Sequence, residues 1–356
     1  VERSRDPQAD LRARIAAARA LGELGDPRFA QGRGPDGDDF LLPPLLVVDA
    51  GRYRVGSDDR LYAGESPAHR VRLASFAIAR FPVTNAEWRL FIAAGGYEDE
   101  RWWQDDAAQR WRRGERTAEG PKHAWRAGRQ WACDNSERID ELLRNGHMTW
   151  QQAEGFEVMR RMTDREFEST LNQRYPAGKK TQPDIWNDPQ YNSALQPVVG
   201  ICWHEARAYC TWLSAQSRQI WRLPSEAEWE AAARGRERRR YAWGDEFEVG
   251  RCNSFETHVR ATTPIGVFPA GDTPEGLADV SGNVFEWTSS AFHPYPYAPD
   301  DRREGANADV RRVIRGGSCS THSALARCAF RNGLDPGHRD YALGLRLVCA
   351  SRILRH

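Results

Sequence analysis

The sequence predicts an α+β fold, because a few clear helices lie among many short strands. Apolar residues recur at helical spacing in two main segments, 84–94 and 203–216, and in a shorter one, 225–234. Most other segments from residue 41 onward are short, alternate apolar and polar residues as strands do, and end at turn residues. With 356 residues the chain is long enough for one large domain or two ordinary ones.

Capping signals mark where these helices begin. Thr84 and Glu87 form a capping-box pair before the first helix, and Ser225 and Glu228 form another before the third. In the second helix Cys210 falls on the apolar face, so its thiol is expected in the core and not on a metal ion.

The N-terminal segment 1–40 is predicted to be a helical arm followed by a linker. Its helix ends at 25–27, and residues 31–39 are rich in glycine and aspartate, as linkers are. The arm is either packed or flexible, or it is the remnant of a helical repeat. The helix places four apolar residues on one face: Leu11, Ile15, Ala18 and Leu21.

The domain that follows is expected to span 41–350. Residues 45–57 are predicted to form a hairpin and residues 69–80 a strand. The polar stretch 97–195 is expected to be an insertion, whose tryptophans either cement irregular loops or form a ligand surface. Helices are expected in it near 136–145, 150–161 and 163–172.

Composition excludes several classes of protein. The 51 basic residues nearly balance 50 acidic ones, which argues against a nucleic-acid binder. The mean hydropathy is −0.73, and no apolar run approaches the roughly 18–20 residues of a membrane span. No secretory signal is visible, so we expect a cytoplasmic protein whose upstream sequence is missing, since the chain begins with Val1. Arginine greatly outnumbers lysine, which is a weak indication of thermal adaptation.

Two segments stand out once the usual enzyme motifs are found to be absent. In the first, residues 279–287, Asp279 and Glu286 flank a Ser-Gly-Asn turn, so that their oxygens could converge on a calcium ion; the alternative is an ordinary turn with two solvated carboxylates. In the second, residues 311–348, strand-like ends enclose a long irregular stretch. Such a stretch is either a functional surface or an idle loop.

Seven motifs occur in the order found in the formylglycine-generating-enzyme (sulfatase-modifying factor) family, which this chain resembles. They are FPVTNAEWRLFIAAGGY, QPVVGICWHEARAYCTWLS, WRLPSEAEWEAAARG, YAWGD, GLADVSGNVFEWTSS, RVIRGGS and GLRLV. The resemblance implies an elaborated C-type lectin fold with little regular secondary structure. It also implies a structural calcium ion, bound by side-chain oxygens of Asp279 and Glu286 and by carbonyls of Gly282 and Val284.

The same resemblance argues against the family's catalysis. Catalytic members hold copper between two cysteines five residues apart, and here Cys328 fits the second position while Ser323 occupies the first. The related sulfoxide synthases need a histidine-rich iron site from an extra helical domain, and nothing in this sequence supplies one. We therefore expect no copper and no enzyme activity.

A third branch of the family fits better at the level of sequence, the variable proteins of diversity-generating retroelements. Their framework resembles the pattern RGGSC…RCAFR…P…R…GLRLV of this chain, which predicts a variable region at 311–348. The residues between the framework positions would then bind the ligand: Ser320, Thr321, His322, Leu325, Phe330, Asn332, Gly333, Leu334, His338, Asp340, Tyr341 and Ala342.

The leading hypothesis is therefore a non-catalytic protein, expected to be a monomer, that displays the segment 320–342 to an unidentified protein or other macromolecular ligand. Buried tryptophans and four arginines, Arg315, Arg327, Arg331 and Arg346, would fix its backbone through carboxylates or carbonyls. The alternative is a metal-dependent oxidase of the formylglycine-generating or sulfoxide-synthase type that uses Cys328. A third hypothesis is a regulatory module whose N-terminal arm docks to an upstream domain.

Overall fold

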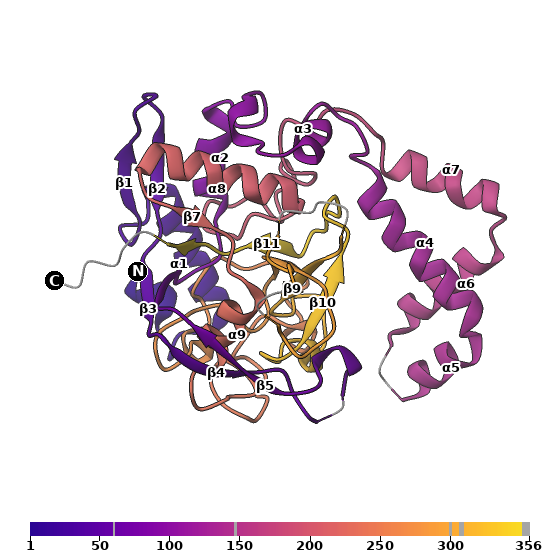
Figure 1. The fold of residues 1–356 in the computed structure, drawn as a ribbon. Coiled ribbons are helices and arrows are strands. Elements are labelled where there is room, and N and C mark those ends of the chain that lie inside the picture. Colours follow the sequence, from indigo (N-terminus) through magenta and orange to yellow (C-terminus); the bar gives the residue numbers. More distant parts are fainter. Residues whose placement is uncertain (60, 146–147, 299–300, 306–309, 351–356) are drawn as a thin grey trace.

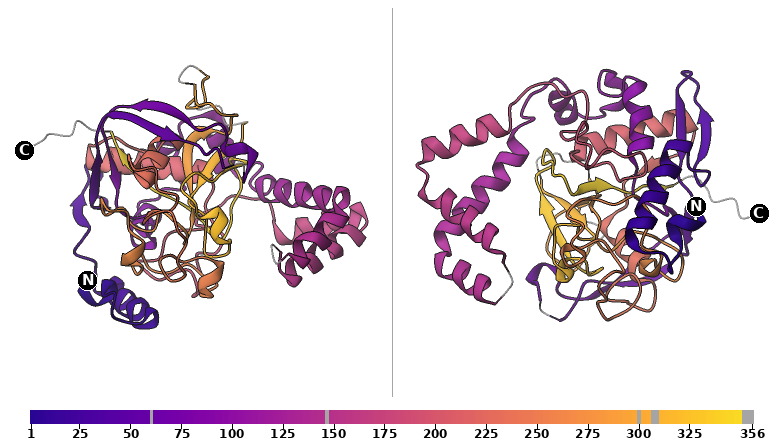
Figure 2. Two further views of the ribbon diagram at one scale, coloured as in Figure 1. Left: turned by 90° about the horizontal axis from the view of Figure 1, so that it is seen from below. Right: turned by 180° about the vertical axis from the view of Figure 1, so that it is seen from behind.

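The computed structural model describes residues 1–59, 61–145, 148–298, 301–305 and 310–350. They form a compact body and a lobe of helices that stands off from it (Figures 1 and 2). The α-helices are α1 (Leu11–Leu24), α2 (Asn85–Ala93), α3 (Asp106–Arg112), α4 (Glu119–Asp134), α5 (Ser136–Arg144), α6 (Trp150–Arg161), α7 (Asp164–Arg174), α8 (Trp203–Ser217) and α9 (Glu226–Arg234). Within the described residues, none of these helices combines the length and apolar character that crossing a membrane requires.

Two four-stranded sheets organise the body. One has the strand order β10-β9-β8-β11 and contains the parallel pair β11–β8, whereas the other has the order β3-β6-β12-β7. Two-stranded pairs β1–β2 and β4–β5 lie beside them. The strands are β1 (Ala30–Arg33), β2 (Asp39–Leu42), β3 (Leu45–Val48), β4 (Gly51–Val55), β5 (His69–Leu73), β6 (Phe76–Ala79), β7 (Trp221–Arg222), β8 (Phe285–Ala291), β9 (Arg312–Arg315), β10 (Arg331–Leu334), β11 (Leu343–Leu345) and β12 (Val348–Cys349).

The three main helices form where the sequence predicts them. At α2 the Thr84 side chain accepts from the Glu87 amide, while the Glu87 carboxylate accepts from the Thr84 amide. Ser225 and Glu228 make the same reciprocal pair at α9. Cys210 is buried in α8, as its place on the apolar face predicts. The α+β class is therefore confirmed.

The tryptophans of the body serve as packing residues, which is the role that the sequence favours. Six of them are almost completely buried, and the largest cluster joins α2, α8, α3 and the central sheet. Trp103 stacks on Trp111 with ring centroids 5.5 Å apart, so residues from the first part of the expected insertion belong to the main core. The six buried rings are Trp88, Trp103, Trp203, Trp212, Trp229 and Trp287.

Strand pairing differs from the sequence-based expectation at two places. Residues 31–39 are not a linker, because β1 and β2 pair in antiparallel register from Ala30↔Leu42 to Arg33↔Asp39. The segment 45–57 is not a hairpin, because β3 pairs with β6 and β4 pairs with β5. In both cases the partner strand is chosen by tertiary packing, which local turn signals do not reveal.

The lobe consists of α4, α5, α6 and α7 (Figure 1). It covers a shorter part of the sequence than the predicted insertion 97–195. Its α5, α6 and α7 match the predicted helices, but α4, 16 residues long, has no counterpart among them. Ala118 stands at the N-cap of α4 without a capping side chain, and glycines occur at 120 and 128, so the sequence lacks the usual capping signal.

Four buried arginines hold the C-terminal stretch against the body. Arg346 bonds the Glu286 carboxylate, with Nη2 and Oε1 2.7 Å apart, and also donates to the carbonyls of Ala79 and Ala278. The other three make equivalent contacts, since each pairs with a buried glutamate. The pairs are Arg315–Glu230, Arg327–Glu65, Arg331–Glu226 and Arg346–Glu286. The prediction that these arginines fix the backbone through carboxylates and carbonyls is confirmed.

We expect Glu226→Gln to lower the free energy of unfolding by about 3–5 kcal/mol, because it leaves buried charge without its counterion. Glu226 bridges Arg303 and Arg331, each at 2.8 Å. Urea unfolding followed by circular dichroism measures the loss. The matched control is Glu157→Gln in the lobe, where a partly exposed carboxylate pairs with Arg160 and Arg161 and the expected loss is below about 1 kcal/mol. Equal losses in the two variants would contradict a stabilising role for the buried pairs.

Candidate functional site

The irregular stretch between β9 and β11 lies on the side of the body that faces the lobe (Figures 1 and 2). Nine of the twelve residues predicted to contact a ligand are partly or fully exposed, from Ser320 to Tyr341. The other three are interior and are not available to a ligand: Phe330, Gly333 and Ala342. This corrects the expectation that all twelve face solvent.

Each of these three exceptions has a packing reason. The Phe330 ring packs edge-on against Tyr62, with centroids 5.2 Å apart, and near Phe285. Gly333 lies in β10, where an added Cβ would come within 2.6 Å of the Phe292 side chain. Ala342 is 1% exposed. Sequence alone could not separate them from their neighbours, because their burial depends on side chains distant in the sequence.

A cavity of about 550 Å³ opens where the C-terminal stretch meets the lobe. One wall comes from residues 338–341, and the other from α4, the end of α7 and the segment that follows it. The contact between these walls is close, since a Cβ on Gly120 would lie 2.2 Å from the backbone of Gly337. Three of the predicted ligand residues therefore line one concave site: His338, Asp340 and Tyr341.

The polar groups of this cavity have perturbed proton affinities. Burial raises the pKa of Asp340, although the Ala342 amide donates to its carboxylate and His338 lies nearby. Burial lowers the pKa of His338, whose Nδ1 lies 3.5 Å from the Gly120 carbonyl. Shifted carboxylates and imidazoles that line a cavity are typical of functional sites.

Aromatic and thiol groups surround Asp340. Tyr341 is 43% exposed, and its ring meets Tyr191 edge-on at 6.0 Å. Burial and the nearby Asp340 charge raise the pKa of the Cys319 thiol to about 12. Cys319 is therefore a neutral thiol beneath the site, and its sulfur is not prepared to bind a metal as a thiolate.

The lobe side of the cavity was not assigned from the sequence. Trp125, Arg174, Tyr175 and Lys180 line it, together with Asp184. One alternative from the sequence analysis is consistent with this wall, namely that the tryptophans of the insertion form a ligand surface. No local motif distinguishes Trp125 from the packing tryptophans, because its role depends on how α4 meets the C-terminal stretch.

The alternative hypothesis, an oxidase that uses Cys328, would need a metal ligand beside this thiol. That thiol is buried in the core with Trp229 and Val280, and burial raises its pKa to about 11. Ser323 lies in a short partly exposed turn and offers only a hydroxyl. Within the described part of the chain, no three His, Cys, Asp or Glu side chains are grouped so that they could hold a metal ion.

The residues of the calcium hypothesis already have protein partners. The Glu286 carboxylate accepts from Arg346 and from Trp229 Nε1, at 2.6 Å for the latter. Asp279 accepts from the Gly266 amide at 2.6 Å, and the Gly282 carbonyl accepts from the amide of Val284. Both carboxylate oxygens of Glu286 thus have protein partners, and the calcium ion remains a prediction for measurement.

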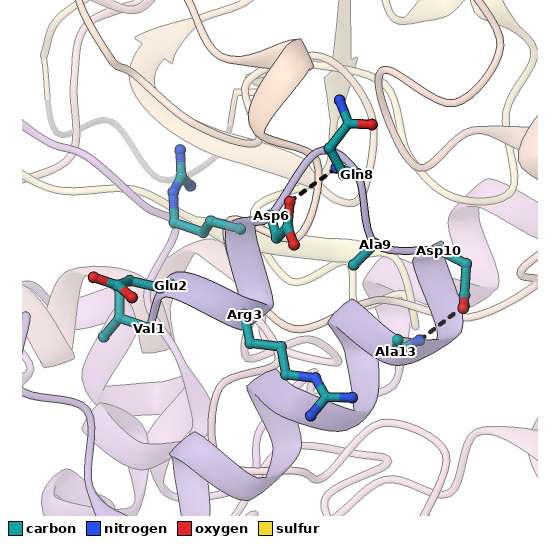
Figure 3. Close-up of a pocket in the computed structure, with 9 residues that line it drawn as sticks. Val1, Glu2, Arg3, Asp6, Gln8, Ala9, Asp10 and Ala13 are labelled. Atoms are coloured by element: carbon teal, nitrogen blue, oxygen red, sulfur yellow. Dashed lines mark hydrogen bonds between the residues drawn. The ribbon is translucent and has the colours of Figure 1, made fainter.

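A larger hollow lies at the N-terminal arm, lined by residues from Val1 to Ala13 (Figure 3). Its carboxylates are used locally, since Asp6 accepts from the Gln8 amide and Asp10 accepts from the Ala13 amide. It is open and contains none of the predicted ligand residues. We therefore place the candidate site at the cavity beside residues 338–341.

The fold and the candidate site together define an α+β domain whose C-terminal stretch is fixed by buried arginines and lines the cavity. The chain belongs to the sulfatase-modifying factor enzyme 1-like domain family, whose model matches residues 35–351. This confirms the resemblance inferred from the seven motifs.

The relatives correct the prediction that the chain is not an enzyme. It is 31% identical to hercynine oxygenase of Mycolicibacterium thermoresistibile over 91% of this chain and 63% of that protein. It is 32% identical to the formylglycine-generating enzyme of Streptomyces coelicolor over 81% of this chain and 82% of that protein. The chain thus spans less than two thirds of the hercynine oxygenase that it matches.

Solved structures support the fold. PvdO from Pseudomonas aeruginosa gives a TM-score of 0.55 at 20% identity, covering 91% of this chain and 99% of that chain. The Treponema denticola variable protein 1 gives 0.54 at 16% identity with the same coverage. At these identities the likeness concerns architecture only, so it confirms the C-type lectin-like fold and does not support a non-catalytic role.

We expect Asp279 to make the stability of the protein depend on pH. Burial raises its pKa from 3.8 to about 6, so the stabilising neutral form is present below about pH 4 and is lost as pH rises through about 6. In a calcium chelator, the wild type should lose up to about 3 kcal/mol relative to Asp279→Asn between pH 4 and 7. Urea titrations at each pH measure this difference.

The same titration tests the calcium hypothesis, because a bound cation favours the charged carboxylate and would lower the pKa of Asp279. If calcium binds there, adding it should abolish the pH dependence and raise the melting temperature at pH 7. A profile that calcium leaves unchanged would remove Asp279 as a ligand.

We expect one fast-reacting thiol in the native protein. Cys133 is exposed, whereas the other six cysteines are buried. A chromogenic disulfide reagent should therefore label one thiol per chain rapidly, and Cys133→Ser should abolish this phase. A second fast thiol that disappears in Cys328→Ser would show that Cys328 is open to copper after all.

Proposed function

We propose that this chain is the substrate-binding portion of an oxidising enzyme of the hercynine-oxygenase type, with its site in the cavity beside residues 338–341. The observation that carries the proposal is the 31% identity to hercynine oxygenase across 91% of the chain. Since the chain spans 63% of that relative, the complete reaction is expected to need groups that the described residues do not provide.

The thiol chemistry favours this function over formylglycine generation. In the family, oxidation of a peptide cysteine uses copper between two thiolates, and a serine hydroxyl is a poor ligand for Cu(I). Here Ser323 replaces one cysteine and Cys328 is fully buried. The iron-dependent members of the family do not use these two thiolates. The serine at position 323 is therefore compatible with a function of the hercynine-oxygenase type.

The described residues do not fit a complete iron site either. They contain no group of three or more His, Cys, Asp or Glu side chains arranged around one point. The role that we propose for this chain is therefore to bind and orient the substrate.

The cavity offers groups that suit hercynine, the trimethylammonium betaine of histidine. A quaternary ammonium binds aromatic faces and carboxylates, and Tyr341 and Asp340 provide one of each. Tyr191 supports the Tyr341 ring from the side. His338 lies beside Asp340, where it can accept a hydrogen bond from the substrate when it is neutral, as its lowered pKa favours.

The experiment combines turnover and binding. The purified chain, and any longer polypeptide that contains it, is supplied with Fe(II), a small thiol and hercynine, and oxygen uptake and product mass are recorded. Calorimetric titration with hercynine gives the dissociation constant. We expect Asp340→Asn, which removes the charge, and Tyr341→Ala, which removes the aromatic face, each to weaken binding about tenfold or more, equivalent to about 1.4 kcal/mol.

The matched control is Glu137→Gln, which replaces an exposed carboxylate in α5 outside the cavity. It should leave binding and turnover unchanged. A copper-loaded reaction with a cysteine peptide tests the other family activity. Turnover of the peptide in the absence of any hercynine binding would contradict the proposal.

A further inference from the structure

The lobe presents an arginine to the cavity in an unusual setting. Arg174 is the last residue of α7, and its guanidinium carbon lies 4.7 Å from the centroid of the Trp125 ring and 5.6 Å from that of Tyr175. The two rings are joined, since Trp125 Nε1 donates to the Tyr175 hydroxyl at 2.7 Å. The guanidinium is therefore held by aromatic faces, which leave its N–H donors free to bind an acceptor.

No carboxylate neutralises Arg174 among the residues that the structure describes. Arg126, Arg129, Arg138 and Arg160 of the lobe form ion pairs with acidic side chains, whereas the exposed Arg144, Arg165 and Arg174 form none within the described part of the lobe. Arg174 is thus the cation of the lobe that lines the cavity and lacks an acidic partner within the described segments.

Two more cations line the same cavity and share one carboxylate. Lys180 Nζ lies 3.2 Å from Asp184 Oδ1, and Arg339 Nη1 lies 2.8 Å from the same oxygen. Positive charge therefore exceeds negative charge on this side of the cavity. An anion bound here would offset this excess of positive charge.

Arg339 adds a second indication of a missing acceptor. It is 5% exposed and stacks over the Trp111 ring, with the guanidinium carbon 5.3 Å from the centroid. Its Nε has no hydrogen-bond partner within the described part of the chain. Buried guanidinium donors are seldom left unsatisfied, so an acceptor supplied by a ligand fits this position.

We propose that the helical lobe supplies a carboxylate clamp, in which Arg174, held by Trp125 and Tyr175 and assisted by Lys180, binds the acidic group of the ligand. The inference deepens the proposed function and rests on it for the identity of the substrate. A carboxylate suits the planar guanidinium, which can bond both of its oxygens. The lobe then selects ligands by their charge, because Arg174 and Trp125 belong to helices that the body does not contribute.

The clamp also orients the ligand. The cavity combines this cationic side with Asp340 and Tyr341, which suit a positively charged group. A zwitterion of the amino-acid type satisfies both, whereas an uncharged ester leaves Arg174 without its acceptor. The substrate class that the cavity selects is therefore a small zwitterion with a free carboxylate.

The test measures how binding depends on the charge of ligand and protein. Hercynine, L-histidine and imidazole-4-acetate are each titrated into the protein by calorimetry, next to their methyl esters. The variants are Arg174→Gln, which removes the charge, and Arg174→Lys, which retains it. The matched control is Arg165→Gln, an exposed arginine on the same helix that does not line the cavity.

We expect at least one free acid to bind the wild type ten or more times more tightly than its ester. Arg174→Gln should remove that preference, Arg174→Lys should restore it in part, and Arg165→Gln should bind as the wild type does. Circular dichroism of each variant establishes that α7 remains folded. If acid and ester bind alike to the wild type, or if Arg174→Gln keeps the preference, the clamp is wrong.

The outcomes separate the clamp from the proposed function. Binding of L-histidine or imidazole-4-acetate that depends on Arg174, without any binding of hercynine, supports the clamp and contradicts the proposed function. Oxidation of hercynine with a KM that Arg174→Gln leaves unchanged supports the function and overturns the clamp.

Discussion

Buried pairs between arginine and glutamate are the interaction on which this structure depends. The C-terminal stretch has few backbone hydrogen bonds of regular structure, so its path is fixed by guanidinium groups that bond both carboxylates and backbone carbonyls. Arg315, for example, pairs with Glu230 and also donates to the carbonyls of Cys328 and Phe330. Burial of both charges makes each pair costly to break and therefore specific for one backbone path.

This internal fixation has a consequence for the surface. Buried ion pairs fix the backbone of the C-terminal stretch. Its exposed side chains are therefore not needed for stability and are free to contact a ligand. The lobe completes the site, since the close approach of Gly120 to Gly337 brings α4 against the loop that carries Asp340. The candidate site thus lies between residues 338–341 of the C-terminal stretch and a helical lobe that has its own small hydrophobic core.

The family relationship and the geometry of the site together limit which of the family's reactions we propose for this chain. Relatives named as enzymes show that this fold supports oxidation, whereas the burial of Cys328 and the serine at position 323 separate the chain from members that use two thiolates. The cavity has a cationic wall and an acidic, aromatic wall, and these two walls are the basis of the proposal that it binds a small zwitterion.

The sequence by itself determined the α+β class, the three main helices, two of them through capping pairs, the tryptophan core and the role of the four arginines. Each of these follows from local periodicity, capping pairs or the cost of burying a charge. Only the tertiary structure decided that residues 31–39 join a hairpin, that Phe330 faces inward and that Arg174 stands beside Arg339 in one cavity. These facts depend on contacts between segments more than a hundred residues apart, or on strand partners, and no local pattern encodes such a contact.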